Sequence, residues 1–334
     1  MAADLNILPP LAGSDESHEL FRYGQQTLYL ADCLEWLAAA EPNSAHAVIT
    51  DPPYGLLEYE PDQQRKLRLG RGGVWRLPPS FDGASRRPLP RFTVLGSDGR
   101  RQLFLFFRSW AERLWPVIRP GGHVFIAGNP LVSPLVGMAM EEAGFERRGE
   151  IVRLVRTFRG GDRPKGAHTE FACVSTMPRS CWEPWGLYRR PLECSTVAAN
   201  LRRWQTGGLR RLSADTPFLD IMPSTQTPER ERKIAPHPSV KPQNFLRRII
   251  TAALPLGEGT ILDPFAGCGT TLAACEATGI TGTGIEIDKT YFDLATESIP
   301  KLARLYPVAP VQYPLQTIEL DASQQEIGEL ERLL

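Results

Sequence analysis

A short apolar run that ends at two consecutive prolines constrains this chain more than any other feature. Residues Ala47-Val48-Ile49 lead directly into Thr50-Asp51-Pro52-Pro53-Tyr54-Gly55. An apolar run stopped in this way is typical of a buried strand, and open α/β sheets carry their chemistry at the edge where such strands end. Each proline fixes its own φ, and the second disfavours helix at the first, so the turn is stiff. The stretch therefore predicts an α/β fold with a rigid turn at a functional sheet edge.

The groups in this turn suit a nucleobase that carries an exocyclic amine. The Asp51 carboxylate and the Pro52 carbonyl can accept the two N–H bonds of the amine, and the Tyr54 ring can stack on the base. A proline-rich turn with a core tyrosine would contain the same residues without any chemistry. Both interpretations stay open on these residues alone.

A second motif, at residues 261–271, reads Ile-Leu-Asp-Pro-Phe-Ala-Gly-Cys-Gly-Thr-Thr. It predicts a strand over 260–262, a glycine-rich loop, and a helix over 270–278. Gly267 and Gly269 allow the backbone to approach a ligand at the helix N-terminus. No lysine follows as in phosphate-binding loops, which disfavours a nucleoside triphosphate.

A further strand, predicted over 283–287, ends in Glu286-Ile287-Asp288. An acidic residue about twenty positions after a glycine-rich loop can bind ribose hydroxyls. We assign that role to Glu286, with Asp288 as the alternative, because Asp288 can also cap the next helix.

Together the two motifs resemble those of the amino-methyltransferase family, the DNA enzymes that methylate adenine N6 or cytosine N4 with S-adenosylmethionine. The residues that match the catalytic motif are Asp51, Pro52, Pro53 and Tyr54. Those that match the cofactor loop are Asp263, Pro264, Phe265, Ala266, Gly267, Gly269 and Thr270. Because the catalytic motif precedes the cofactor loop, the chain resembles the β group of this family. The resemblance implies an α/β, Rossmann-like class I methyltransferase fold with permuted motif order, a mixed but mostly parallel sheet, and a small DNA target-recognition region.

The resemblance also implies cofactor contacts outside the loop. Asp32 and Cys33, about twenty positions before the catalytic motif, match the place where the family has an acid beside the cofactor adenine; Asp32 with Glu35 also fits a helix N-cap and its capping box. The segment 237–242 resembles the motif that contacts the methionine portion, which implies roles for His237, Ser239 and Lys241. As plain structure it is the entry to a helix over 243–254 with Pro242 at its first position. A lysine there is unfavourable for the helix dipole unless a carboxylate lies nearby.

The basic residues are concentrated in one part of a chain whose formal net charge is zero. Between residues 147 and 211 there are 14 Lys and Arg against 5 Asp and Glu, a net charge of +9. Such asymmetry indicates a surface that faces a polyanion. The residues predicted to contact double-stranded DNA are Phe158, Arg159, Arg163, Lys165, Arg202 and Arg203. Phe158 would be a second stacking face for the base, although an ordinary core or loop phenylalanine fits equally.

The remaining patterns divide the chain into regions. The predicted regions are an N-terminal arm (1–26), a catalytic half (27–176) with a basic loop (56–101), a target-recognition region (177–235), a cofactor-binding half (236–306) and a C-terminal tail (307–334). The other strands are predicted over 27–30, 123–127, 150–156 and 170–176. The other helices are predicted over 33–40, 102–118 and 133–144, the last with Ser133 as N-cap. The basic loop could close over DNA or be a solvated excursion, and the acidic tail could be a terminal helix or a homodimer contact.

The cysteine pattern and the length of the apolar runs indicate where in the cell this protein is expected. The six cysteines form no C-x-x-C pair and no compact cluster with histidine, so neither zinc nor a disulfide framework is expected. The sequence contains neither a signal peptide pattern nor an apolar run of about 18 residues. We therefore expect a soluble, cytoplasmic protein without a membrane partner.

The expected activity is site-specific methylation of adenine N6 in double-stranded DNA by base flipping. Hydrogen bonds to Asp51 and the Pro52 carbonyl would localise the amine lone pair, and Tyr54 would hold the base in line with the methyl donor. Cytosine N4 is the close alternative, since enzymes of that type more often have Ser where Asp51 stands. RNA or protein glutamine would usually come with Asn at that position. A catalytically silent DNA-binding subunit is the alternative of another class, and a cognate restriction nuclease is a potential partner.

Overall fold

The computed structural model describes residues 19–53, 97–155, 161, 163–164, 166–237 and 239–306. Their centre is a nine-stranded sheet with the order β1-β2-β9-β8-β3-β4-β6-β5-β7. The strands are β1 (Leu20–Tyr23), β2 (Gln26–Leu30), β3 (Ala45–Thr50), β4 (Ile118–Ala127), β5 (Glu146–Leu154), β6 (Trp182–Arg189), β7 (Ile221–Pro223), β8 (Thr260–Asp263) and β9 (Thr281–Glu286). Within these strands only β1 and β6 run against the others. The predicted mixed, mostly parallel sheet is confirmed.

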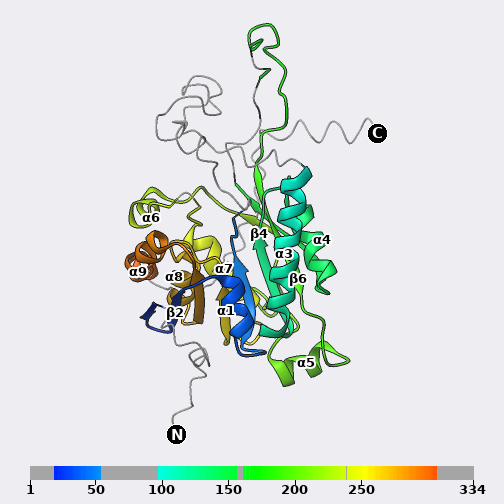
Figure 1. Cartoon of the computed structure of the whole chain (residues 1–334), viewed down its shortest axis with the longest axis vertical. Helices are drawn as coiled ribbons and strands as arrows, with labels where there is room; N and C mark the ends of the chain where they lie inside the picture. The colour runs from blue at the N-terminus through cyan, green and yellow to red at the C-terminus, as the bar shows by residue number, and fades with distance from the viewer. Residues whose placement is uncertain are drawn as a thin grey trace.

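Helices cover both faces of this sheet (Figure 1). They are α1 (Cys33–Ala39), α3 (Ser97–Val117), α4 (Ser133–Glu142), α5 (Val197–Trp204), α6 (Glu229–Ile234), α7 (Gln243–Ala253), α8 (Thr270–Ala277) and α9 (Lys289–Arg304). Alternate residues of β3 face opposite sides, as strand geometry requires. Val48 packs with α1, α3 and α4, whereas Ala47 and Ile49 pack with α7 and α8. Because β3 is covered on both faces, its sequence is a continuous apolar run.

The permuted halves meet at the middle of the sheet. β3 pairs in parallel with β8, with Val48 opposite Leu262, and β8 pairs in parallel with β9. The three strands therefore end at the same edge, which carries Asp51, the glycine-rich loop and Glu286. The expectation that two sheet ends far apart in the chain meet in space is confirmed for these strands.

Several predicted boundaries were wrong near glycine and proline. α3 begins at Ser97, inside the expected basic loop, and β4 begins at Ile118, across the Pro120-Gly121-Gly122 segment that was expected to separate helix from strand. A bulge in the β3–β4 pairing between Ala45 and Ala47 accommodates that segment. Ser133 is the first residue of α4 rather than its N-cap, and no side chain caps this helix. Pro242 is the N-cap of α7 rather than its first residue.

The largest error concerns the strand predicted over 170–176. These residues form turns and are exposed, and the strand that pairs with both β4 and β5 is β6. Pro184 and Gly186 within β6 concealed it, because both residues are unfavourable in a strand interior. Trp185 and Tyr188, which the sequence placed in the target-recognition region, are therefore core residues of the central sheet, 1% and 3% exposed.

The expected N-terminal arm also contains structure. Leu20–Tyr23 forms β1, which turns back at Gly24 (φ 55°) and pairs antiparallel with β2. None of the helices that the structure describes is long and apolar enough to cross a membrane.

Candidate active site

The two motif-bearing strand ends are joined by a buried hydrogen bond. The Thr50 hydroxyl, at the end of β3, donates to the Asp263 carboxylate, at the end of β8, across 2.7 Å. The same Asp263 oxygen accepts the Phe265 backbone N–H at 3.2 Å. Burial raises the pKa of Asp263 to about 6, although hydrogen bonds from Thr271, Thr50 and the Phe265 backbone oppose the rise. Asp263 therefore anchors the start of the glycine-rich loop to the catalytic turn.

Asp51 lies directly after β3 and forms an ion pair with Lys241. The Lys241 ammonium is 2.5 Å from Asp51 Oδ2 and 3.6 Å from Glu183 Oε1. Burial alone would lower the pKa of Lys241, but the charges of Asp51 and Glu183 outweigh it and leave the pKa above its usual value. Lys241 was predicted to bind cofactor; that role stays a prediction, and the structure places its charge on the catalytic turn.

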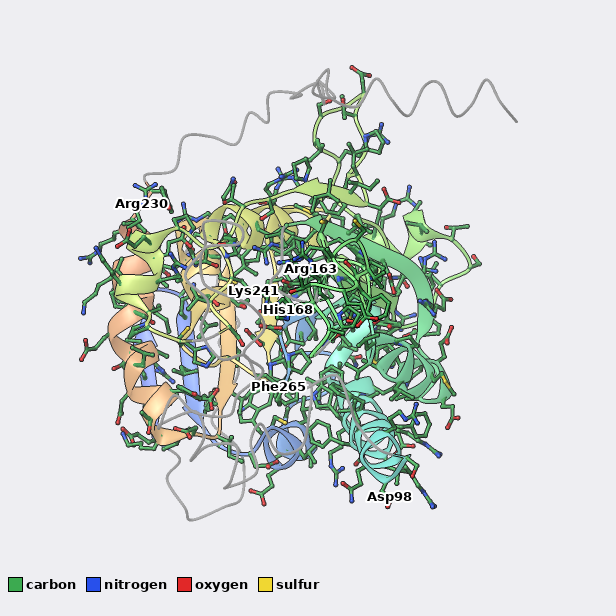
Figure 2. The ribbon with its side chains drawn as sticks, turned by 90° about the horizontal axis from the view of Figure 1, so that it is seen from above. Asp98, Arg163, His168, Arg230, Lys241 and Phe265 are labelled. Atoms are coloured by element: carbon green, nitrogen blue, oxygen red, sulfur yellow. The ribbon has the colours of Figure 1, made fainter. Side chains whose placement is uncertain are left out.

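A pocket between β3, the loop after β8 and the segment before α7 brings Asp51 together with part of the predicted cofactor site, while Glu286, Asp32 and Cys33 lie outside its lining. Its empty space is about 350 Å³, a figure that includes the part open to solvent. The lining residues are Asp51, Trp185, His237, Ser239, Lys241, Leu246, Asp263, Phe265, Ala266, Gly267, Cys268, Thr270 and Thr271. Seen from above the sheet edge, Lys241 and Phe265 lie near the middle of the molecule (Figure 2).

The glycine-rich loop is shaped by two left-handed residues and one carboxylate. Gly267 and Gly269 have φ of 51° and 76°, and a Cβ on Gly269 would lie 2.5 Å from the Ile299 side chain. Glu286 accepts the Gly267 backbone N–H at 2.7 Å with one oxygen and the Asp288 N–H at 2.8 Å with the other. Burial raises the pKa of Glu286, against the effect of these two bonds. A carboxylate has about four acceptor positions, so Glu286 retains capacity for a ligand hydroxyl.

The other predicted cofactor residues lie at the neighbouring strand end. β2 pairs with β9 so that Leu30 is opposite Glu286, and the next residues are Ala31, Asp32 and Cys33. Asp32 caps α1 by accepting the backbone N–H groups of Leu34 and Glu35, which confirms the N-cap interpretation. Burial raises the pKa of the Cys33 thiol to about 12, with further contributions from the nearby charges of Asp32 and Glu286.

His237 lines the pocket, and Asp288 lies outside its lining. Asp288 caps α9, as its alternative role required, by accepting the N–H groups of Thr290 and Tyr291. His237 packs edge-on against Tyr291 with ring centroids 4.4 Å apart, and its Nδ1 accepts the Ser239 backbone N–H at 3.1 Å. Burial lowers the pKa of His237.

The predicted DNA contacts are only partly described. Tyr54, Phe158, Arg159 and Lys165 lie outside the described residues. Arg163 belongs to the connection between β5 and β6. Because β5 runs in the same direction as β4, this connection leaves the sheet at the edge that carries Asp51. Part of it, residues 166–180, extends beyond that edge in Figure 1.

Arg202 and Arg203 are not brought to the site. They lie on α5, which is held at the amino end of β4 because Asn200 donates to the Pro120 carbonyl at 2.9 Å. Thr50 is opposite Ile126, six residues further along β4, so α5 is about 20 Å from the catalytic edge. Arg203 also pairs with Glu193 at 2.8 Å.

Sequence reasoning missed Glu183, Trp185 and Arg153. Glu183 and Trp185 were missed because β6 was not recognised, and Arg153 because it was counted with the DNA-facing charge. The unusual feature that could have indicated them is a carboxylate within the aromatic run 182–188, which can be buried only with a cationic partner.

Comparison with known proteins decides the family. Residues 45–297 match the family model for N6/N4 methylases, described as DNA methylase. The chain belongs to the N6/N4 DNA methylase family. This membership confirms the predicted β-group DNA amino-methyltransferase and S-adenosylmethionine as its cofactor.

Relatives and solved structures agree with this assignment. The N6/N4 methylase is 24% identical over 280 residues to the type II methyltransferase M2.DpnII of Streptococcus pneumoniae, covering 84% of this chain and 91% of that protein. It is 22% identical to M.HindIII of Haemophilus influenzae, covering 81% and 94%. Its fold is similar to the M1.HpyAVI–SAM complex (TM-score 0.52, 18% identity, 82% and 98% covered) and to the cytosine-N4-specific PvuII methyltransferase (TM-score 0.52, 12% identity, 83% and 91% covered).

The residues around the glycine-rich loop fit S-adenosylmethionine in their donor set. Glu286 lies beside the pocket, bonded to the Gly267 backbone, and retains acceptor capacity for ribose hydroxyls. Gly267 lines the pocket and would admit the cofactor close to the loop backbone. When bound, the cofactor supplies a methyl group on a positively charged sulfur.

Replacing Glu286 with glutamine is expected to weaken S-adenosylmethionine binding by about 10- to 100-fold, or about 1.4–2.8 kcal/mol. The amide nitrogen of glutamine would face a backbone N–H of Gly267 or Asp288 and cannot accept a ribose hydroxyl. Isothermal titration calorimetry with the cofactor measures the change. Glu276→Gln is the matched control, because Glu276 also accepts a backbone N–H, from Gln25, but in the last turn of α8, whereas the glycine-rich loop precedes its first turn. Equal affinity in wild type and Glu286→Gln would contradict the assignment.

Proposed function

We propose that this N6/N4 DNA methylase methylates adenine N6 in double-stranded DNA at a defined sequence, with the target base flipped into the pocket beside Asp51. The observation that carries the proposal is the carboxylate at position 51, held at the end of β3 within the pocket and paired with Lys241. The sequence likeness to type II methyltransferases supports DNA of defined sequence as the substrate.

The residues of the turn have distinct tasks in this proposal. Asp51 accepts one N–H of the amine, and the carbonyl of the buried Pro52 accepts the other, so the nitrogen lone pair is drawn out of conjugation with the ring. Pro53 is exposed and directs the chain toward Tyr54, for which we propose stacking on the flipped base. After methyl transfer the nitrogen carries an excess proton, which Asp51 is placed to accept.

Cytosine N4 offers the same amine chemistry, and the fold is similar to a cytosine-N4-specific enzyme. We favour adenine because the enzymes of this family that act on cytosine N4 more often have Ser where Asp51 stands in this chain.

The product decides between the two bases. Unmethylated DNA is incubated with the enzyme and the methyl donor, digested to nucleosides and examined by mass spectrometry. We expect N6-methyladenine as the only new nucleoside, with no N4-methylcytosine. N4-methylcytosine would overturn the adenine assignment but leave the family intact. If neither methylated nucleoside forms on DNA that contains every short sequence, the proposed activity is wrong.

A further inference from the structure

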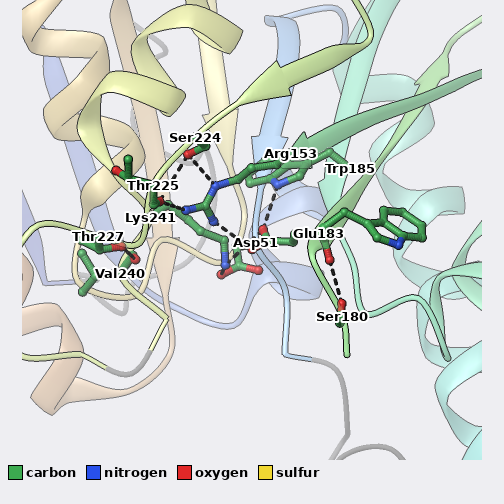
Figure 3. A network of polar contacts seen from close by, with 11 residues as sticks. Asp51, Arg153, Ser180, Glu183, Trp185, Ser224, Thr225, Thr227, Val240 and Lys241 are labelled. Carbon is green, nitrogen blue, oxygen red and sulfur yellow. Dashed lines mark hydrogen bonds and ion pairs between the residues drawn. The ribbon is translucent and has the colours of Figure 1, made fainter. Parts of the chain in front are cut away.

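The catalytic carboxylate is the first member of a chain of four alternating charges. Asp51 pairs with Lys241, Lys241 lies 3.6 Å from Glu183, and Glu183 pairs with Arg153 at 2.9 Å. We refer to these four residues as the ion chain. Their side chains are only 5–17% exposed, and Figure 3 shows them side by side next to the end of β3.

The inner half of the ion chain is fixed from several directions. Glu183 Oε1 accepts the Trp185 indole N–H at 2.8 Å, and its other oxygen accepts from Arg153. Arg153 also donates to the Ser224 hydroxyl at 3.0 Å and to the Thr225 carbonyl at 2.8 Å. Glu183 is thus held by Trp185 on its own strand and by Arg153 on β5, and Arg153 is held by the residues that follow β7. A buried carboxylate held in this way has little freedom to follow Lys241 or to leave it.

Burying the ion chain costs desolvation free energy, and the fold could be formed without these charges. Four charges from four separate segments are taken out of water, and apolar residues of similar volume would stabilise such a position as well or better. Arg153 even lies over the Phe245 ring, 5.1 Å from its centroid, where an apolar side chain would pack. The four buried charges therefore indicate a functional role, and that role is connected with Asp51, the residue at the end of the ion chain.

We propose that Lys241, Glu183 and Arg153 are positioning residues that hold the Asp51 carboxylate aimed at the substrate amine. The proposal rests on the proposed catalytic role of Asp51. Lys241 holds Asp51 Oδ2, and Glu183, held by Arg153 and Trp185, fixes where the Lys241 ammonium lies. Because Lys241 stays protonated, it is not itself a base for the product proton.

The geometry predicts which kinetic constant changes. Lys241→Met removes the partner of Asp51 Oδ2, so the carboxylate is no longer held in one orientation. Because Asp51 acts on the amine in the transition state, kcat should fall, while KM for DNA and the affinity for S-adenosylmethionine change little. Glu183→Gln leaves Lys241 in place but holds it less firmly, so its effect should be smaller.

The test is a comparison of kcat, KM for duplex DNA and affinity for S-adenosylmethionine at one pH. We expect kcat to fall by about tenfold or more in Lys241→Met, to return toward wild type in Lys241→Arg, and to fall less in Glu183→Gln, with KM and cofactor affinity within about threefold of wild type. Glu146→Gln is the matched control, since Glu146 also pairs with a buried arginine, Arg189, at 2.6 Å but at the far end of the sheet. Its kcat should not change.

A double-mutant cycle separates positioning from a general structural role. When Asp51 is already alanine, Lys241→Met should have little further effect on the rate of methyl transfer, because Lys241 acts through Asp51. If Lys241→Met lowers the rate by the same factor in the Asp51→Ala enzyme as in wild type, or leaves the wild-type rate unchanged, the ion chain does not act through Asp51 and the proposal is wrong. An Asp51→Ala enzyme with wild-type activity would instead overturn the catalytic role on which the proposal rests.

Discussion

Replacing Asp51 with alanine is expected to lower the rate of methyl transfer by about 10²–10³-fold, while S-adenosylmethionine affinity changes by less than about threefold. Loss of one preorganised group that stabilises transition-state charge typically has an effect of this size. Here the effect is compounded, because the Lys241 ammonium, 2.5 Å from the carboxylate that is removed, would face an amine that becomes positively charged. The cofactor contacts through Glu286 and the glycine-rich loop are not touched by the change.

Single-turnover transfer of a labelled methyl group measures the rate, and calorimetry measures the cofactor affinity. Asp51→Asn separates geometry from charge, because asparagine keeps an acceptor oxygen of the same shape but no negative charge. It should lie between wild type and Asp51→Ala. Asp293→Ala, which removes an exposed carboxylate paired with Lys289 on α9, controls for the loss of charge. A rate for Asp51→Ala within tenfold of wild type would exclude Asp51 as the group that activates the amine.

The parts of the fold that local sequence determines were predicted correctly. β3 and β8 are short runs rich in apolar residues that lead into proline-containing turns, and β9 ends at the acidic residue Glu286, shortly before Asp288. The three strand ends carry Asp51, the glycine-rich loop and Glu286 as expected. Asp32 and Asp288 cap their helices because an aspartate just before a helix can accept its first N–H groups. Parallel strands of this kind must end at one edge, so the meeting of the two motifs could be inferred without coordinates.

The features that depend on tertiary pairing could not be predicted. β6 contains Pro184 and Gly186, which local propensity assigns to a turn, yet pairing on both sides with β4 and β5 makes it a central strand. The partner of Asp51 was missed for the same reason. Lys241 follows Asp51 by 190 residues. The sequence around Lys241 indicated only that it lies at the start of a helix, and not which carboxylate it contacts.

Counting charge along the chain also overestimated the DNA-facing surface. Arg153 and Arg189, two of the basic residues in the +9 segment, are buried and paired with Glu183 and Glu146. A sum of charges does not distinguish a buried ion pair from a solvated surface cation. The basic residues that remain near the catalytic edge, such as Arg163, are therefore better candidates for phosphate contact than those on α5.

Acidification from pH 8 to pH 4 is expected to remove several kcal/mol of folding stability, because two buried histidines must stay neutral in the fold. Burial and the charge of Arg119 lower the pKa of His46 to about 4, although a hydrogen bond to Gln205 opposes this. Burial, with Arg189 and Arg148, lowers the pKa of His123 to about 3. Between these values and the unfolded pKa of about 6.5 the unfolded chain binds more protons, so stability falls as pH falls through that window.

The loss of folding free energy is about 1.4 kcal/mol for each unit by which the pKa of a group differs between the folded and the unfolded state. His46 contributes up to about 3 kcal/mol and His123 up to about 5 kcal/mol, with the His123 part complete only near pH 3. Asp263 acts in the opposite direction, because its pKa is raised to about 6 and the folded state binds its proton first. That gain, about 3 kcal/mol by pH 4, offsets only part of the histidine loss.

Urea unfolding at pH 8, 7, 6 and 5 tests the assignment with His46→Asn. Asparagine can still accept the Thr260 backbone N–H, which His46 Nδ1 accepts at 2.9 Å, but it cannot be protonated. The variant should be less stable than wild type at pH 8, because the contact to Gln205 is lost, and the difference should shrink or reverse by pH 5. His168→Asn, at an exposed position, should leave the pH dependence unchanged. If His46→Asn instead loses stability with acid as steeply as wild type, proton binding by His46 is not what destabilises the fold.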